Sequence, residues 1–266
     1  MPRVNLNTLS LYYEICGKGH PILLISGLNA DNASWVGVRS KFAKNFRVIV
    51  FDNRGSGRSD TPKKKYSIRQ MADDAVRLLD HLLIKKCHVI GHSMGGYIAQ
   101  ELAIHYPDRV GKLILEATAP ISSSRNNILF NDFLKRLEKD HDNEALMRLW
   151  TYWSFSPKTF ERKDYISKFI KCASTYPYLQ SAQGFKGQIE AIASFNACAE
   201  IKNIKAKTFV IVGSDDILIY PTESIKLVKG IRGSIFEEIK DTGHCVHVEN
   251  PGVFTSKSIQ FLNQKT

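Results

Sequence analysis

Short apolar segments alternate with amphipathic segments over most of the chain, and this alternation predicts the order of its elements. Continuous apolar runs, which are typical of strands buried on both faces of a sheet, occur at residues 21–25, 47–51, 87–90, 110–115 and 207–212. Residues 66–83 instead place their apolar positions at the three- and four-residue intervals of one helix face. Strands that alternate with helices predict parallel pairing and a doubly wound α/β sheet.

The two ends of the chain extend this pattern. Residues 4–15 alternate apolar and polar positions around Asn7 and Thr8, which predicts an antiparallel hairpin. Trp35 and Phe42 are expected on a helix between the first two buried strands. Further patterns predict helices over 94–106, 222–228 and 251–262 and a last strand over 234–239.

The pattern changes in the middle of the chain. From residue 119 to residue 204 strand signals vanish, and apolar positions recur at helical intervals. We therefore predict a core made of residues 1–118 and 205–266, with residues 119–204 inserted as a helical cap. The cap is rich in rings that could line an apolar pocket or serve helix packing, and we expect two or three of them to face a ligand: Trp150, Tyr152, Trp153, Phe155, Phe160, Tyr176, Tyr178 and Phe185.

One motif links a predicted strand to a predicted helix. Residues 87–90 lead into Gly91-His92-Ser93-Met94-Gly95, which is the strand, G-x-S-x-G turn and helix that present a serine at the top of a sheet. Glycine at 91 and 95 removes side chains that would collide as the backbone turns sharply. The motif alone occurs by chance in about one chain in ten of this length, so its context makes Ser93 the candidate nucleophile.

A serine hydroxyl needs a base to take its proton, and the base needs an acid to fix its tautomer. His244 follows the last predicted strand, so in a parallel sheet it reaches the same carboxyl edge as Ser93. His92 and His247 are its rivals, but we expect the turn to point His92 away from the hydroxyl, and His247 could begin the closing helix. We predict His244 as the base.

The acid should follow another strand at the same edge. Asp215 and Asp216 follow the strand at 207–212, and the chain order Ser, Asp, His fits this architecture. The G-x-x-D spacing from Gly213 favours Asp216, while Asp215 and Glu116 are further candidates. Either aspartate could instead cap the next helix.

Composition narrows the classes of function. The chain is 43% hydrophobic and 24% charged, as in globular proteins. It has no run of the roughly eighteen apolar residues that span a membrane, and its first residues lack the apolar core of a secretory signal, so a cytoplasmic location is expected. The five cysteines are scattered without metal-site spacing, which predicts free thiols and no metal.

The loop at 52–60 contains two glycines but neither a phosphate-cradle motif nor a dinucleotide fingerprint, so no cofactor is expected. Within it, Arg54 should bond loop carbonyls while Asp52 caps the loop or pairs with Arg54. The net charge of +11 comes from Lys and Arg spread over the whole chain, and no nucleic-acid motif accompanies them. A solvated basic surface is therefore predicted rather than a nucleic-acid partner, while the sequence does not define the oligomeric state.

Together these segments resemble the α/β-hydrolase fold family, of the esterase and lactonase type, over almost the whole chain. The resemblance rests on residues 91–96, 52–59, 213–216, Gly243-His244 and Glu249-Asn250-Pro251. It implies a mostly parallel eight-stranded sheet with helices on both faces, a triad of Ser93, Asp216 and His244, and an oxyanion hole of the Leu28 and Met94 backbone N–H groups. Where many relatives carry His-Gly this chain has Ser26-Gly27, which is more similar to enol-lactone hydrolases such as those acting on 3-oxoadipate enol-lactone.

The expected activity is that of a serine hydrolase, a carboxylesterase or lactonase acting on a small molecule through an acyl-enzyme on Ser93. The same residues could serve hydrolysis of a carbon–carbon bond in a dienoate, of an amide at an N-terminal proline, or acyl transfer to another acceptor. A slow-turnover ligand receptor is the competing hypothesis from a different class. The sequence does not identify the acyl and alcohol groups.

Overall fold

The structure is a computed structural model that describes residues 2–6, 9–139 and 142–264. These residues form one eight-stranded sheet in the order β1-β2-β4-β3-β5-β6-β7-β8. The strands are β1 Arg3–Asn5, β2 Ser10–Cys16, β3 His20–Ile25, β4 Phe46–Phe51, β5 Cys87–His92, β6 Val110–Glu116, β7 Lys207–Gly213 and β8 Ile235–Ile239. In this order, each strand from β4 through β3, β5, β6 and β7 to β8 is parallel to the next, whereas β2 is antiparallel to both β1 and β4.

Helices connect the strands in the described ranges. The α-helices are α1 Val36–Phe42, α2 Ile68–His81, α3 Met94–His105, α4 Ser124–Lys139, α5 Asn143–Ser154, α6 Pro157–Glu161, α7 Lys163–Ser174, α8 Ala182–Ala193, α9 Pro221–Gly230, α10 Val246–Glu249 and α11 Pro251–Asn263. Short 3-10 turns are η1 Asn32–Trp35, η2 Pro107–Arg109 and η3 Ile201–Asn203. α2 begins at a capping box, in which Ser67 and Gln70 satisfy each other's backbone N–H groups.

The helices bury the sheet from both sides. Apolar residues of α2 and α3 pack on one face, together with Leu23, Val89 and Leu113 of the central strands. The opposite face packs on α1 and α11, with Trp35 and Phe254 fully buried between them. Because both faces are covered, the central strands are apolar throughout, as the continuous runs in the sequence predict.

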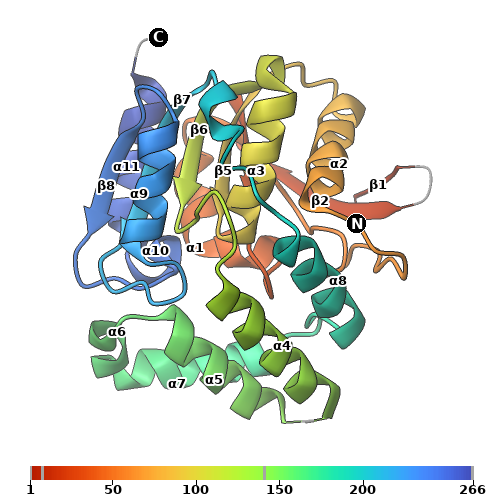
Figure 1. Ribbon diagram of the computed structural model, residues 1–266, viewed down its shortest axis with the longest axis vertical. Helices are drawn as coiled ribbons and strands as arrows, with labels where there is room; N and C mark the ends of the chain where they lie inside the picture. Colours follow the sequence, from red (N-terminus) through yellow and green to blue (C-terminus); the bar gives the residue numbers. More distant parts are fainter. Residues whose placement is uncertain (1, 7–8, 140–141, 265–266) are drawn as a thin grey trace.

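Five helices, α4 to α8, follow β6 and precede β7 in the chain, and they form the cap. Figure 1 shows α4 to α7 as a layer beyond the end of the sheet to which the β6 and β8 arrows point. The cap therefore covers the carboxyl ends of the parallel strands, where ligands bind in open α/β sheets.

The strands, the hairpin and the long helices lie where the sequence predicts them, although Asn7 and Thr8 fall outside the described residues. The cap predicted over 119–204 is helical and contains α4 to α8, whereas α10 was not predicted as a separate helix. In the described ranges no helix combines the length and apolarity needed to cross a bilayer. The cytoplasmic location stays a prediction, as do the domain boundaries at 119 and 204.

Candidate active site

Ser93 lies in the sharp turn between β5 and α3, in a backbone conformation that L-residues seldom adopt. Its φ is 54° and its ψ is −118°. Two hydrogen bonds hold the turn: the Ser93 N–H donates to the Glu116 carbonyl at 2.9 Å, and the Thr118 hydroxyl donates to the Ser93 carbonyl at 2.9 Å. Strain of this kind persists only where the surroundings enforce it, and it concentrates at functional sites.

Both glycines of the motif are required by close backbone packing. A Cβ at Gly91 would lie 2.3 Å from the Gly95 carbonyl oxygen, and one at Gly95 would lie 2.1 Å from that of Ile25. These distances are far below van der Waals contact, so α3 can approach the ends of β3 and β5 only with glycine at both positions.

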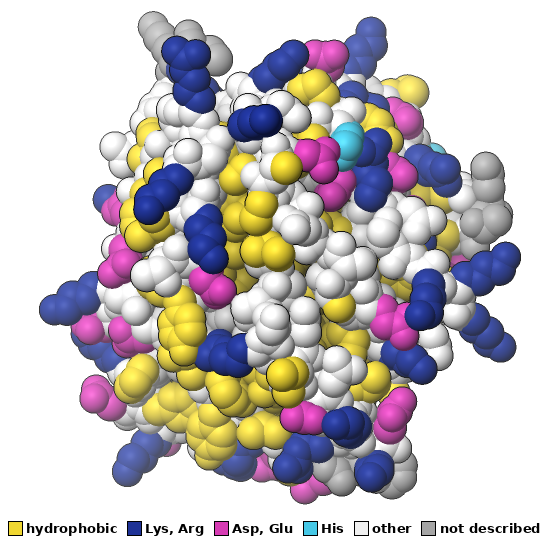
Figure 2. Space-filling model, viewed as in Figure 1, with side chains coloured by type: hydrophobic (Ala, Val, Ile, Leu, Met, Phe, Trp, Pro, Cys, Tyr) yellow, Lys and Arg dark blue, Asp and Glu magenta, His cyan; other side chains and the backbone are white. Residues whose placement is uncertain are grey.

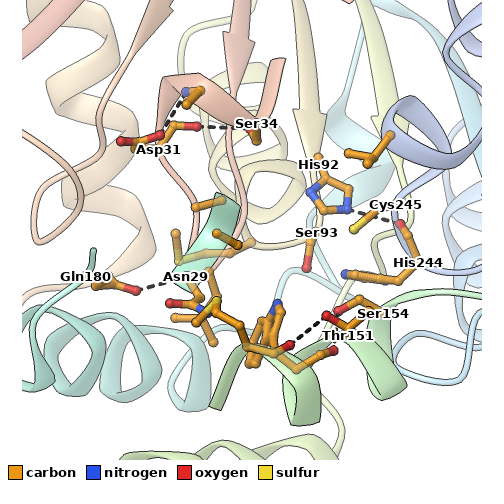
Figure 3. Close-up of a pocket in the computed structure, with 18 of the residues that line it drawn as sticks. Asn29, Asp31, Ser34, His92, Ser93, Thr151, Ser154, Gln180, His244 and Cys245 are labelled. Carbon is orange, nitrogen blue, oxygen red and sulfur yellow. Dashed lines mark hydrogen bonds between the residues drawn. The ribbon is translucent and has the colours of Figure 1, made fainter. Parts of the chain in front are cut away.

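His244 and Asp216 are brought together from the loops that follow β8 and β7. The His244 Nδ1–H donates to Asp216 Oδ2 at 2.8 Å, and both side chains are buried. The other oxygen, Oδ1, accepts the Leu218 and Ile219 N–H groups at 2.9 Å each, so the turn fixes the carboxylate. Figure 3 shows the His244 ring directed toward the Ser93 hydroxyl, with both facing one cavity. Asp216 thus caps its own turn and also contacts the histidine.

Asp215 and Glu116, the two further candidates for the acid, have different partners. Asp215 accepts a hydrogen bond from the neighbouring Ser214 hydroxyl at 2.8 Å and is half-buried. Glu116 is fully buried and accepts both the backbone N–H and the Nδ1–H of His247, at 2.9 and 2.8 Å. The site therefore contains two histidine–carboxylate pairs, and His247 belongs to α10 rather than to the closing helix.

His92 connects the two pairs. Its Nε2–H donates to the main-chain carbonyl of His244 at 3.1 Å, and its ring lies 4.9 Å from the His244 ring and 4.8 Å from that of His247. Burial, followed by the nearby His247 and His244, holds the pKa of His92 well below its usual value. His92 is therefore a neutral hydrogen-bond donor that fixes the backbone of His244, and its Nε2–H is directed away from the Ser93 hydroxyl as the turn predicts.

His92, Glu116 and His247 are also the described residues that could best hold a metal ion. One ligand atom from each lies within 4.8 Å of the others. Ligands on a tetrahedral zinc ion lie about 3.4 Å apart, given bonds of about 2.1 Å. Atoms that lie up to 4.8 Å apart would have to move closer together, so the geometry does not fit a tetrahedral metal as it stands.

The loop after β3 lies beside Ser93. A Cβ at Gly27 would lie 3.1 Å from the Ser93 Cβ, and the next residue, Leu28, lines the cavity. Met94 is the first residue of α3, so its N–H has no acceptor within the helix. The structure thus brings the backbone at Leu28 and Met94 to the Ser93 turn.

The cavity in front of Ser93 has a volume of about 590 Å³, within the range of small-molecule sites. The cap supplies much of its wall. Four of the eight predicted rings line it, namely Trp150, Phe155, Tyr176 and Tyr178. Tyr152, in contrast, is half exposed and stacks on Phe160, away from the cavity.

Sequence reasoning missed Glu249 as a structural connection between the cap and the loop that carries His244. One of its carboxylate oxygens accepts the Gly243 N–H at 2.8 Å. The other accepts the Ser156 N–H, the Ser156 hydroxyl and the Thr159 hydroxyl at 2.9, 2.8 and 2.6 Å. The position of this acid, five residues after the histidine, is visible in the sequence, but spacing alone does not indicate what it binds.

The prediction for the loop at 52–60 was wrong for Arg54, whereas Asp52 caps the loop, which was one of its two predicted roles. Arg54 binds Asp74 of α2 through two hydrogen bonds of 2.7 Å, not loop carbonyls or Asp52. Asp52 instead accepts the Asn32 and Arg58 backbone N–H groups at 3.0 and 2.8 Å and lies 3.3 Å from the Arg58 guanidinium. The loop is thus fixed by one ion pair within it, Asp52 with Arg58, and by one to another element, Arg54 with Asp74, which supports a structural role.

Known proteins resemble the chain over nearly its full length. A sequence model described as alpha/beta hydrolase fold matches residues 20–251. RutD of Azorhizobium caulinodans, which carries the name of a proposed carbamate hydrolase, is 28% identical and covers 99% of each chain. An enol-lactonase from Burkholderia xenovorans is 27% identical with a TM-score of 0.90, covering 99% of this chain and 100% of that one. A thermophilic esterase from Thermogutta terrifontis is 27% identical with a TM-score of 0.87, covering 98% of both chains.

Proposed function

Because the chain belongs to the α/β-hydrolase fold family, we propose that it is a serine hydrolase that cleaves a carboxylic ester or a lactone through an acyl-enzyme on Ser93. The observation that carries the proposal is the alignment of Ser93, His244 and Asp216 at one edge of the sheet, with the His244 Nδ1–H bonded to Asp216 at 2.8 Å. Because Nδ1 of His244 carries the hydrogen in this bond, Nε2 is unprotonated and faces the Ser93 hydroxyl. A general base needs this tautomer.

The reaction runs in two steps. His244 takes the Ser93 proton as the hydroxyl oxygen attacks the carbonyl carbon, and the same proton then passes to the departing alkoxide. In a lactone the alkoxide stays attached to the acyl group. Water then attacks the acyl-enzyme, again giving its proton to His244, and the acid leaves as Ser93 regains its hydrogen.

Two charges develop during each step, and the site has a group for each. The Leu28 and Met94 backbone N–H groups would bind the oxyanion, and each such donor is typically worth about 10²–10³ in rate. Asp216 would stabilise the charged imidazolium of His244. Its carboxylate needs no reorganisation, because the Leu218 and Ile219 amides already hold it.

The two histidine–carboxylate pairs make a sharp test possible. Ser93→Ala and His244→Ala should each lower kcat for a short-chain aryl ester by about 10³-fold or more. His247→Gln, at the second pair, should keep more than about a tenth of the activity. A fluorophosphonate probe followed by peptide mass spectrometry should label Ser93 only. If Ser93→Ala kept more than a few per cent of the activity, or the His247 variant lost as much as His244→Ala, the assignment would be wrong.

Carbamate hydrolysis is a second candidate, favoured by the similarity to RutD. The same attack and the same oxyanion apply, because a carbamate differs from an ester only in the nitrogen on its carbonyl carbon. Matched aryl carbamates and aryl esters would separate the two by their kcat/KM values.

A wider set of substrates tests the remaining reactions that a serine triad of this kind can catalyse. Dienoates test carbon–carbon cleavage, prolyl amides test amide cleavage, and added alcohols test acyl transfer. A full burst of product without steady-state turnover would instead favour a receptor.

A further inference from the structure

Several polar side chains in the wall of the cavity already use their hydrogens in bonds within the protein. The Thr151 and Ser154 hydroxyls of α5 donate back to carbonyls of their own helix, at 2.6 and 2.9 Å (Figure 3 draws the Thr151 bond). The Asn126 amide donates to the Leu218 carbonyl at 2.6 Å. A hydroxyl hydrogen committed to the protein is not free for a ligand, so Thr151 and Ser154 offer no donor to an anionic group, and Asn126 has already used one of its two amide hydrogens.

Gln180 is satisfied in the same way. Its amide nitrogen donates to the Gly55 carbonyl at 2.8 Å and lies 3.2 Å from the Ser56 hydroxyl, while its oxygen accepts the Asn29 N–H at 3.1 Å. Figure 3 shows Gln180 reaching from the cap to Asn29 at the far side of the cavity from His244. This amide therefore fastens the cap to the core rather than presenting a donor to a ligand.

The charges at the cavity do not favour an anion. Among the described residues that line it there is no Lys or Arg, and the carboxylate present is Asp31. Asp31 accepts the Ala33 N–H at 2.8 Å and the Tyr176 hydroxyl at 2.7 Å. Burial, followed by the charge of Asp52, raises its pKa. The chain's excess of positive charge lies outside, as Figure 2 shows for one face, where Lys and Arg are scattered singly over the surface.

Arg58, which approaches the cavity wall from behind, is already neutralised. Its guanidinium lies 3.3 Å from Asp52, 3.8 Å from Asp31 and 3.8 Å from Glu14. It is also stacked between the Tyr12 and Tyr178 rings, at 3.9 and 4.6 Å. A cation held by carboxylates and rings in this way cannot turn toward a substrate.

We infer that the site accepts uncharged esters or lactones with an apolar acyl group and rejects acyl chains that end in a carboxylate. The inference rests on the proposed function and narrows its substrate class. A carboxylate buried without a counter-charge loses hydration that neutral donors replace only in part. The same physics disfavours dienoate substrates, which carry such a group.

Three para-nitrophenyl esters of equal length test the inference. One is the half-ester of adipic acid, whose free end is a carboxylate; the second replaces that carboxylate with an isopropyl group, and the third with a primary amide. We expect kcat/KM for the isopropyl ester to exceed that of the half-ester by about 100-fold or more. The amide should fall between them, because it is polar but uncharged.

A matched pair of variants tests whether the missing positive charge causes the rejection of the half-ester. Met147 lines the cavity from α5 and is partly exposed, so Met147→Lys can place an ammonium at the wall, whereas Met147→Gln adds polarity alone. Lys should raise kcat/KM for the half-ester at least about tenfold, and Gln should not. Equal rates for the half-ester and the isopropyl ester in the wild type would overturn the inference and leave the proposed function standing. Failure of all three esters, with no labelling of Ser93 by the probe, would overturn both.

Discussion

The contact through Glu249 between the cap and the loop that carries His244 predicts a defect in kcat as well as in stability. In Glu249→Gln one oxygen becomes an NH2 group. The amide is expected to keep its oxygen on the side of Ser156 and Thr159, where three donors converge, and to turn its NH2 toward the Gly243 N–H. Two donors then face each other in a buried place, directly before His244.

The magnitude follows from the bonds lost. A hydrogen bond to a charged group contributes about 1.5–3 kcal/mol, and an unpaired buried donor costs about 1–3 kcal/mol. Since these costs overlap, Glu249→Gln should lower the free energy of unfolding by about 2–4 kcal/mol. A displaced Gly243 also shifts His244 relative to Ser93, and a misplacement of about 1 Å can cost about 10²-fold. We therefore expect kcat to fall by about 10- to 100-fold, with KM changed less than about threefold.

Thr159→Val is the matched control, because it removes one donor on the cap side and leaves the bond to Gly243 in place. It should cost about 1 kcal/mol in urea unfolding and leave kcat within about threefold of the wild type. Both variants are assayed well below their unfolding midpoints with the isopropyl ester. If Glu249→Gln lost stability but kept wild-type kcat, Glu249 would only hold the cap in place and the reasoning would be refuted.

Two further predictions concern strained and buried groups. Ser93→Gly should be more stable than Ser93→Ala by about 1 kcal/mol in urea unfolding, because glycine relieves the positive φ of 54°; equal stabilities would show that the turn stores no strain. His88 has its pKa lowered to about 4 by burial, then by His20 and Lys112, and its Nδ1 accepts the Lys112 N–H at 2.9 Å. As the pH falls, His88 takes up its proton in the unfolded chain before it does so in the folded one. The stability present above about pH 6.5 should therefore be lost as pH falls toward 4. His88→Gln can still accept the Lys112 N–H, and it should make the free energy of unfolding depend less on pH in this range.

The elements that the sequence predicts well are those whose signals are local. The buried strands are continuous apolar runs, and the Ser93 turn requires glycine at 91 and 95 because of backbone contacts within a few residues and one neighbouring strand. The places of Ser93, Asp216 and His244 follow from counting to the ends of β5, β7 and β8, since parallel strands end at a common edge. Their convergence was therefore predictable, whereas their role in catalysis stays a proposal.

The sequence does not predict which charged side chains bind each other when the partners are distant in the chain. Arg54 has Asp52 two positions away, yet it binds Asp74 on another element. Glu249 binds Ser156, which lies 93 positions away in the chain. Such pairs form because the packed apolar surfaces bring the groups together, and any acid on the correct helix face would look the same in the sequence. The cap rings are similar, because burial in the helix packing and burial at the cavity need the same residue types.

The two histidine–carboxylate pairs show that a position at a strand end does not by itself predict which carboxylate binds which histidine. His92 and Glu116 are directly opposite each other in the β5–β6 register, two positions beyond Ile90 and Ile114, so their side chains share the face that packs on α1 and α11. Glu116 therefore meets His247 beneath the sheet edge, where Trp35 covers the His247 ring at 4.4 Å. Asp216 is free of that alternation because it lies in the turn after β7, and it reaches His244 at the cavity. The strand end nearest Ser93 thus supplies a supporting pair, and the acid best placed to act comes from a more distant strand.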